Sequence, residues 1–277
     1  MRLIVTSQQD KAGVNIYQTL AKGFGFTASG EFEGKPVYKR AGREEIWLIA
    51  TAQLSTMASH LDEHFDPEYY VFASRHRSEG GGKILTVHAP GNLGERAQAG
   101  GRPRELALAN PEAMKVALRE LKAAVGEKGL AYKVAMEATH HGPTELRRPV
   151  LFVEVGSGPE EWEDPRAVEA VAVAALKAAE NREAFPRAIG IGGKHYAPIH
   201  TKFALESTVA IGHVIPEYAL DALDPTILAQ AVARSKASFG LLDWKGMRRE
   251  QMEKVLSMAS SLELELKRGR DLLKENI

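Results

Sequence analysis

Short aliphatic runs alternate with longer amphipathic segments along all 277 residues, and this alternation restricts the fold class most strongly. We predict strands at residues 3–5, 35–39, 45–50, 68–74, 83–88, 130–137, 150–155, 187–191, 207–213 and 262–266. We predict helices at residues 10–22, 110–125, 164–181, 224–236 and 247–259. Because no repeat or clear linker divides the pattern, we expect a single three-layer α/β domain spanning residues 1–277.

The chain contains no cysteine, which limits the chemistry of any site. Disulfides, thiolate zinc sites and a cysteine nucleophile are excluded, so a metal must be held by His, Asp, Glu or main-chain oxygen. The longest apolar run, residues 170–176, is far shorter than the roughly 18 residues of a membrane span. No signal-peptide pattern is visible. We therefore expect a cytoplasmic protein without a membrane partner.

The net charge is zero, but the basic residues are distributed unevenly. Residues 75–104 carry six basic side chains against two acidic ones, Glu79 and Glu95, a local charge of +4. Within this window, residues 91–104 hold four glycines and show no apolar periodicity, which predicts a mobile basic loop that acts as a lid. Such a loop suits a polyanionic ligand, although solvated surface charge explains the pattern equally well.

Six of the nine histidines lie at or just after the end of a predicted strand. They are His76, His88, His140, His141, His195 and His213. Ligands gather where the strands of an open α/β sheet run out into loops, and neighbouring glycine and proline fix the direction of the chain there. We expect some of the six to converge on an enzyme site. His60 and His64, four residues apart on a predicted helix, are interpreted as a surface pair.

Imidazoles together with a carboxylate hold zinc with one position open for water, and zinc polarises an ester carbonyl. Glu154, within the apolar run LFVEV, is the carboxylate that we single out, because a buried lone glutamate must be paired or ligated. An ion pair with a basic core residue explains Glu154 equally well. A metal-free alternative uses one histidine as general base, oriented by Glu154 or Asp164. Residues 190–193 lack the spacing of phosphate-binding loops, although their N–H groups can approach an anion.

An ordered set of motifs resembles one protein family. The set comprises RHRS at 75–78, LTVH at 85–88 with Gly91-Asn92, ATHHGPT at 138–144, EVGS at 154–157, Trp162, GGKHYAP at 192–198, Gly212-His213 and DWKG at 243–246. It resembles the archaeal and plant type of D-aminoacyl-tRNA deacylase over nearly the whole chain. The resemblance implies a mixed central sheet between helical layers, similar to phosphorylases and peptidyl-tRNA hydrolases. It also implies zinc-dependent hydrolysis of the ester that joins a D-amino acid to the 3′ end of tRNA.

With this resemblance, candidate roles can be assigned to individual residues. The candidate catalytic residues are His140, His141, His195 and Glu154, and the candidate Zn²⁺ ligands are His88, His140, His195 and His213. The candidate residues for binding the substrate, including its tRNA, are Arg75, Arg77, Arg102, Arg104, Gly142, Pro143, Thr144, Gly192, Gly193 and Lys194. Gly142-Pro143 is a candidate wall against L-amino acids, although a simple turn explains this pair better. Lys194 departs from the family pattern, which commonly has glycine before this histidine.

Two other function classes stay open. A zinc-dependent hydrolase of small esters or amides predicts no salt-dependent affinity for RNA. A non-catalytic tRNA-binding module predicts binding without hydrolysis, and the number of strand-end histidines counts against it. A phosphorylase-like activity on nucleosides rests on fold analogy alone. No feature of the sequence indicates an obligate protein partner.

Overall fold

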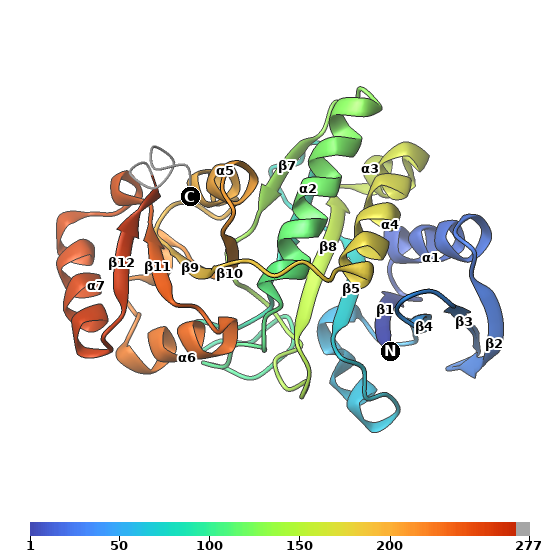
Figure 1. Cartoon of the computed structure of the whole chain (residues 1–277), viewed down its shortest axis with the longest axis horizontal. Coiled ribbons are helices and arrows are strands. Elements are labelled where there is room, and N and C mark those ends of the chain that lie inside the picture. The colour runs from blue at the N-terminus through green and yellow to red at the C-terminus, as the bar shows by residue number, and fades with distance from the viewer. Residues whose placement is uncertain (270–277) are drawn as a thin grey trace.

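The computed structural model describes residues 1–269 and contains two β-sheets with helices packed on them (Figure 1). The strands of the large sheet are β1 (Arg2–Ser7), β2 (Thr27–Phe32), β3 (Lys35–Arg40), β4 (Ile46–Thr51), β5 (Tyr70–Arg75), β6 (Ile84–His88), β7 (Lys133–Met136) and β8 (Val150–Gly156). Their order across the sheet is β2-β3-β4-β1-β5-β8-β6-β7.

The large sheet is mixed, as expected. Strands β4, β1, β5 and β8 run parallel, β6 is antiparallel to β8, and β7 is parallel to β6. At the other edge, β3 pairs antiparallel with both β2 and β4. The central strands β1, β5 and β8 are rich in aliphatic and aromatic residues and are buried almost throughout, as expected for strands covered on both faces.

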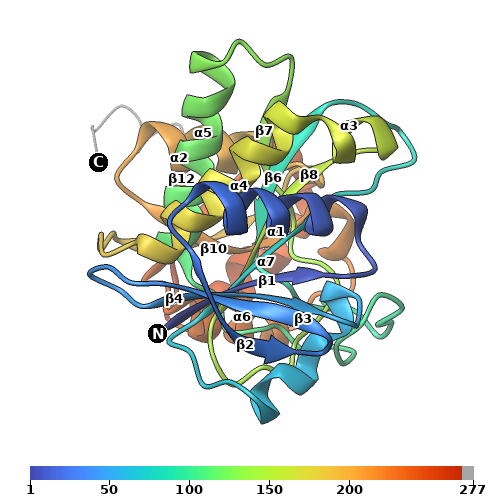
Figure 2. The same cartoon turned by 90° about the vertical axis from the view of Figure 1, so that its right-hand side faces the viewer.

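Three helices pack on one face of the large sheet. They are α1 (Lys11–Gly23), α2 (Pro111–Glu127) and α4 (Pro165–Glu180), and the short α3 (Pro159–Glu163) precedes α4. Helix α4 packs against both α1 and α2, and Figure 2 shows α4 beside α1 above the strands. Alanines make up most of its buried residues, and their small side chains let both neighbouring helices approach closely. The expected burial of this helix on more than one face is confirmed.

The second sheet corrects the expectation of one central sheet. Its four strands, β9 (Arg187–Ile191), β10 (Ala210–Ile215), β11 (Phe239–Leu242) and β12 (Glu265–Arg268), are all parallel in the order β10-β9-β11-β12. The connecting helices are α5 (Pro198–Glu206), α6 (Pro225–Ser235) and α7 (Arg249–Ser261). The sequence pattern contains the same strand–helix alternation in both halves, so it does not specify which strands pair.

Most predicted elements are present, and the missed ones have weak patterns. Side-chain caps confirm four predicted helix starts, because Asp10, Asn110, Asp164 and Asp224 each accept a backbone N–H of the first turn. Two strands were not predicted from the sequence: β2, which is polar and exposed, and β11, which has only four residues. The short helices α3 and α5 were not predicted either, whereas the helix predicted around His60 and His64 is present as the 3₁₀ helix Ser55–Glu63, with His64 directly after its end. None of the helices within residues 1–269 is long and apolar enough to cross a membrane.

Helix α2 joins the two sheets. Its apolar residues belong to one core cluster that also contains residues of β9, β10 and β11. Lys115 of α2 is buried, and its Nζ donates to the backbone oxygens of Ala204, Ser207 (2.7 Å) and Val209 (3.1 Å) in the segment that leads into β10. The large sheet and the small sheet therefore share apolar core and buried hydrogen bonds. One domain over residues 1–277 stays a prediction, and residues 270–277 lie outside the described part.

We predict that Lys115→Ala lowers the free energy of unfolding by about 1–3 kcal/mol, because buried carbonyl oxygens lose their donor. Denaturant unfolding of the wild type and the variant measures the difference. Lys122→Ala, on the exposed side of the same helix, is the matched control and should change the free energy by less than about 0.5 kcal/mol. Equal effects of the two substitutions would contradict the buried role of Lys115.

Candidate active site

One face of the large sheet carries a row of polar residues across its central strands. Ser74 of β5, Glu154 of β8 and Thr86 of β6 lie side by side in the strand register. Phe152, two residues before Glu154, pairs with His88 at the carboxyl end of β6. Because alternate residues of a strand point to the same face, these side chains share one face of the sheet. Helices α1, α2 and α4 also pack on strands of this sheet, but none of these polar groups comes from them.

Two buried carboxylates form the centre of the site. Glu137 follows β7, and its Oε2 lies 2.8 Å from His195 Nε2 and 3.7 Å from His140 Nε2. Its Oε1 lies 3.2 Å from His76 Nδ1. Glu154 Oε1 accepts a hydrogen bond from the Ser74 hydroxyl at 2.7 Å.

His76 connects the two carboxylates. Glu154 Oε2 lies 3.6 Å from His76 Nδ1 and 3.6 Å from His88 Nε2. Together these contacts define a cluster, which we call the His–Glu cluster. It consists of His76, His88, Glu137, His140, His141, Glu154 and His195.

The charges of the His–Glu cluster compensate one another. Burial alone would raise the pKa of Glu137, but His195 and His76 hold this pKa well below its usual range. Burial would likewise raise the pKa of Glu154, but its contacts with His76 and His88 lower it. Burial alone would lower the pKa of His76, yet the two carboxylates raise it to about 11. Both carboxylates are therefore ionised at neutral pH, and His76 is an imidazolium that offsets part of their charge.

His140 and His141 are the neutral members of the cluster. Burial and the nearby His88 lower the pKa of His141 to about 4 and that of His140 well below its usual range. His140 Nδ1 lies 2.8 Å from the Ala138 oxygen, and His141 Nδ1 lies 2.7 Å from the Gly142 oxygen. Because a carbonyl only accepts hydrogen bonds, both Nδ1 atoms carry the proton. Each Nε2 therefore has a free lone pair that can bind a metal or accept a proton.

Two loops bring histidines from distant parts of the chain to Glu137. His140 and His141 lie in the turn after β7, and His195 lies in the loop after β9 of the small sheet. In this second loop Gly192 and Gly193 have φ values of +87° and +83°, which favour glycine. The Ala138 N–H donates to the His195 oxygen at 2.7 Å, so the two loops are hydrogen-bonded to each other.

The segment 91–104 is packed on the turn after β7 and does not form the expected free lid. Asn92 Nδ2 donates to the Gly100 oxygen at 2.9 Å, and the Arg102 N–H donates to Thr144 Oγ1 at 2.8 Å. A Cβ on Gly142 would lie only 2.3 Å from the Gly101 nitrogen, so these backbones are in close contact. Thr144 is therefore buried and supports the loop. The glycines of this segment allow the two backbones to pack closely. The sequence pattern alone does not distinguish this role of glycine from loop mobility.

The predicted arginines are distributed over different environments. Arg104 pairs with Asp224 and, at 3.3 Å, with Glu95, which indicates a structural role. Arg102 is exposed and 3.9 Å from Glu105. The Arg75 guanidinium lies over the Trp162 ring, 5.4 Å from its centroid, while Arg77 and Lys194 are exposed.

His213 is placed outside the cluster, which corrects its inclusion among the metal ligands. Its Nε2 donates to the Ala107 oxygen at 2.9 Å, and its Nδ1 accepts from the Thr139 hydroxyl at 3.0 Å. The Thr139 oxygen in turn accepts the Val214 N–H at 3.0 Å. With both ring nitrogens committed in a buried network, His213 has no lone pair left for a metal. A strand-end position alone does not distinguish such a structural histidine from a ligand.

Comparison with known proteins assigns the family. The family model for D-aminoacyl-tRNA deacylase matches residues 63–267. The chain belongs to the D-aminoacyl-tRNA deacylase family. It is 40% identical to a D-aminoacyl-tRNA deacylase of Pyrococcus furiosus over 274 residues, covering 96% of this chain and 98% of the relative. It is 41% identical to one of Methanosarcina acetivorans over 224 residues, covering 79% and 75%.

A solved structure supports the fold. A crystal structure of a conserved protein of unknown function matches with a TM-score of 0.89 at 34% identity, covering 99% of this chain and 97% of the other. The resemblance to D-aminoacyl-tRNA deacylases inferred from the ordered motifs is thus confirmed at the level of the family.

Four residues at the site of this deacylase-family chain received no role in the predictions made from sequence. Glu137 is the central carboxylate, and its only signal was a charge at the end of a buried strand next to two histidines. His76 was noted at a strand end but received no role. Tyr196 and Tyr218 contact His76 and His195 through their hydroxyls, at 2.9 Å and 3.2 Å. Those contacts depend on loops that meet only in the folded chain.

We predict that His213→Ala lowers the free energy of unfolding by about 2–4 kcal/mol at pH 7, because it opens a cavity and leaves buried partners unsatisfied. Burial lowers the pKa of His213 to about 4. The unfolded chain therefore binds more protons between about pH 6.5 and pH 4, and the stabilisation by His213 is lost as the pH falls through this range. Denaturant unfolding at pH 7 and pH 5 should show a smaller difference between wild type and variant at pH 5. A difference that grows on acidification would contradict this role.

Proposed function

We propose that the chain hydrolyses the ester bond of D-aminoacyl-tRNA and releases the free D-amino acid and tRNA. The observation that supports this most directly is the buried Glu137 carboxylate, in contact with His195 and close to His140, in a chain of this family. Ester hydrolysis needs an activated water, stabilisation of the oxyanion and a proton for the leaving ribose oxygen. The His–Glu cluster contains groups suited to each of these tasks.

Zinc fits the donor set around Glu137. The ligand atoms of Glu137, His140 and His195 lie within 4.8 Å of one another, and both histidines are partly exposed, which leaves room for water. The second nitrogen of each ring is anchored, on the Ala138 oxygen for His140 and on the Tyr218 hydroxyl for His195, as is usual for metal-binding histidines. We propose that these three residues bind Zn²⁺. Zinc bound there would lower the pKa of a water molecule and polarise the ester carbonyl.

His88 supports the presence of a ligand in the cluster. Its side chain is fully buried, neither ring nitrogen makes a hydrogen bond within residues 1–269, and the nearest charged group is Glu154 Oε2, 3.6 Å from Nε2. A buried polar atom without a partner is costly, so such an atom calls for an explanation. His88 forms a second group of potential ligands with His140 and His141, whose atoms also lie within 4.8 Å of one another. We propose that His88 is an additional metal ligand.

The side chains of the cluster can supply the remaining proton transfer. Protonated His76 has its Nε2 at 2.9 Å from the Tyr196 hydroxyl, which places a donor beside the cluster. When the ester C–O bond breaks, Tyr196 donates a proton to the ribose oxygen and receives one from His76. The attacking water adds its hydroxyl to the acyl carbon, and its remaining proton passes through solvent back to His76. His141 Nε2, unprotonated at neutral pH, accepts a hydrogen bond from this water.

A basic groove beside Tyr196 supports RNA as part of the substrate. The cavity measures about 720 Å³, and we call it the lysine groove. Its lining includes Lys83, Lys122, Lys133, Lys202, Tyr132 and Tyr196. Glu206, the acidic residue of the lining, lies 3.8 Å from Lys202. Lysines in such excess attract phosphate groups, and this groove suits the tRNA acceptor end better than the paired Arg104.

The remaining finer assignments are part of the same proposal. The exposed Arg77, Arg102 and Lys194 are available for tRNA phosphates, and Gly192-Gly193 offers N–H groups near the cluster. The packed Gly142-Pro143 turn next to His141 is the proposed wall against L side chains. We further propose a fold related to phosphorylases and peptidyl-tRNA hydrolases, a cytoplasmic location and no obligate protein partner.

We predict that His140→Ala and His195→Ala each lower D-tyrosyl-tRNA turnover by about 10²-fold or more, because each removes a proposed ligand of the reacting centre. Binding of uncharged tRNA should stay within about threefold of the wild type, since neither ring contributes a phosphate contact. Release of D-tyrosine and L-tyrosine from matched tyrosyl-tRNAs measures the activity and its D-selectivity. His64→Ala is the matched control, because His64 is exposed and packs against Phe32 of the edge strand β2 rather than against the His–Glu cluster. Wild-type rates in both cluster variants would contradict the assignment.

Metal removal is tested in the same assay. We predict that a chelator abolishes D-selective release and that added zinc restores it, because Glu137, His140 and His195 alone cannot activate water strongly. If the chelator does not change the activity, the proposed substrate still holds and the zinc proposal is contradicted. Hydrolysis of small esters without release from either tRNA would favour the rival hydrolase.

A further inference from the structure

The small sheet is an open parallel sheet whose winding changes direction between β9 and β11. In its order β10-β9-β11-β12, the chain leaves β9 toward one edge and leaves β11 toward the other. The two connections therefore diverge at the carboxyl ends of β9 and β11, which makes this the topological switch point. Ligands of open α/β sheets bind in the crevice at such a point. The proposed hydrolytic centre lies on the face of the large sheet and takes only His195 and Tyr196 from this end of the small sheet.

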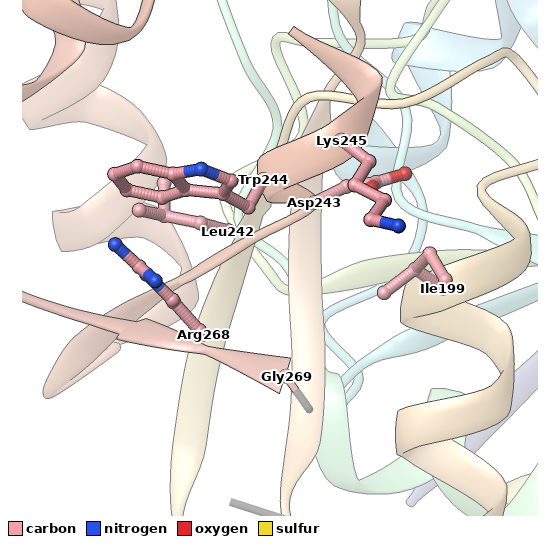
Figure 3. Close-up of a pocket in the computed structure, with 7 residues that line it drawn as sticks. All are labelled: Ile199, Leu242, Asp243, Trp244, Lys245, Arg268 and Gly269. Atoms are coloured by element: carbon pink, nitrogen blue, oxygen red, sulfur yellow. The ribbon is translucent and has the colours of Figure 1, made fainter. Parts of the chain in front are cut away.

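A pocket lies beside this point, at the carboxyl ends of β11 and β12, and Figure 3 shows its lining. Leu242, Asp243, Trp244 and Lys245 come from the end of β11 and the turn after it, Arg268 and Gly269 come from the end of β12, and Ile199 comes from α5. We call it the Trp244 pocket. Its volume of about 220 Å³ is on the scale of one planar base.

The side chains of the Trp244 pocket match the parts of an unpaired nucleotide. The Arg268 guanidinium lies over the Trp244 ring, 3.6 Å from its centroid, and 40% of Trp244 is still exposed. Unpaired bases stack on such aromatic and guanidinium surfaces. Lys245 extends toward Ile199 on the other side of the pocket (Figure 3), so two cations flank it. Asp243 is largely buried, and its Oδ1 accepts the Gly246 N–H at 3.2 Å, so its carboxylate fixes the turn that carries Trp244 and Lys245.

The Trp244 pocket is physically connected to the loop that carries His195. The Gly193 N–H donates to the Gly246 oxygen at 3.3 Å. A Cβ on Gly193 would lie 2.9 Å from Asp243 Oδ2, so the two loops are in close contact. His195 is only two residues further along the chain. A nucleotide in the pocket would therefore lie against the loop that positions a residue of the hydrolytic centre.

We propose that the Trp244 pocket binds one unpaired nucleotide at the 3′ end of the tRNA substrate. The base stacks on Trp244, and the phosphate pairs with Lys245 and Arg268. This proposal rests on the proposed function, because it names the part of that substrate which the small sheet binds.

The experiment compares Trp244→Ala and Arg268→Ala with the wild type in binding uncharged tRNA, using filter binding at one fixed salt concentration. Intact tRNA and tRNA shortened by its last three nucleotides are both measured. Because one stacked base is lost, either variant should bind intact tRNA about 5- to 100-fold more weakly than the wild type does. On shortened tRNA, which lacks that base, the variants and the wild type should bind equally. Lys39→Ala is the matched control, because Lys39 lies over the ring of Trp47, 3.8 Å from its centroid, on the edge hairpin.

The possible results separate this proposal from the proposed function. Equal binding of intact tRNA by Trp244→Ala and wild type, or a loss that persists on shortened tRNA, would overturn it. Quenching of Trp244 fluorescence by free AMP or CMP, without any effect of the variants on tRNA binding, would also overturn it in favour of a free-nucleotide site. Since the assay needs no hydrolysis, a protein that binds as expected but releases no D-amino acid would contradict only the proposed function.

Discussion

The Glu137 carboxylate is buried beneath two loops and remains ionised because imidazoles surround it. Burial of a lone carboxylate is costly, and the contacts to His195 at 2.8 Å and His76 at 3.2 Å offset this cost. His195 comes from the small sheet, whereas His76 and Glu137 come from the large one. The two sheets must therefore be docked for the charges to balance. Backbone hydrogen bonds from Ala138 to His195 and from Thr139 to Val214 hold the two parts together at this point.

The same arrangement divides the histidines into two kinds. His76 is held as an imidazolium between two carboxylates, while His140 and His141 are kept neutral by burial and by neighbouring imidazoles. A cluster with both protonated and unprotonated rings at one pH can donate protons and bind a metal at the same time. His213 is the contrasting case, because both nitrogens of its buried ring form hydrogen bonds within the fold.

Local signals in the sequence predicted much of the fold and part of the site. Helix starts at Asp10 and Asp224 follow from short-range capping chemistry, and the strand around Glu154 follows from its apolar run. The importance of Glu137 could not be predicted in this way, because it depends on which histidines approach it from other strands and loops. Strand order is a long-range property as well, so the second sheet was not foreseen. The glycines at 91–104 predicted mobility, but they serve close packing of backbones against the turn after β7.

The central claim is that Glu137 is the carboxylate of the hydrolytic centre, and Glu137→Gln tests it most directly. Glutamine keeps the size of the side chain and removes its charge. Single-turnover release of D-tyrosine from D-tyrosyl-tRNA should fall by about 10²-fold or more in this variant, while the protein stays folded and binds uncharged tRNA. A wild-type rate in a folded Glu137→Gln variant would contradict the account.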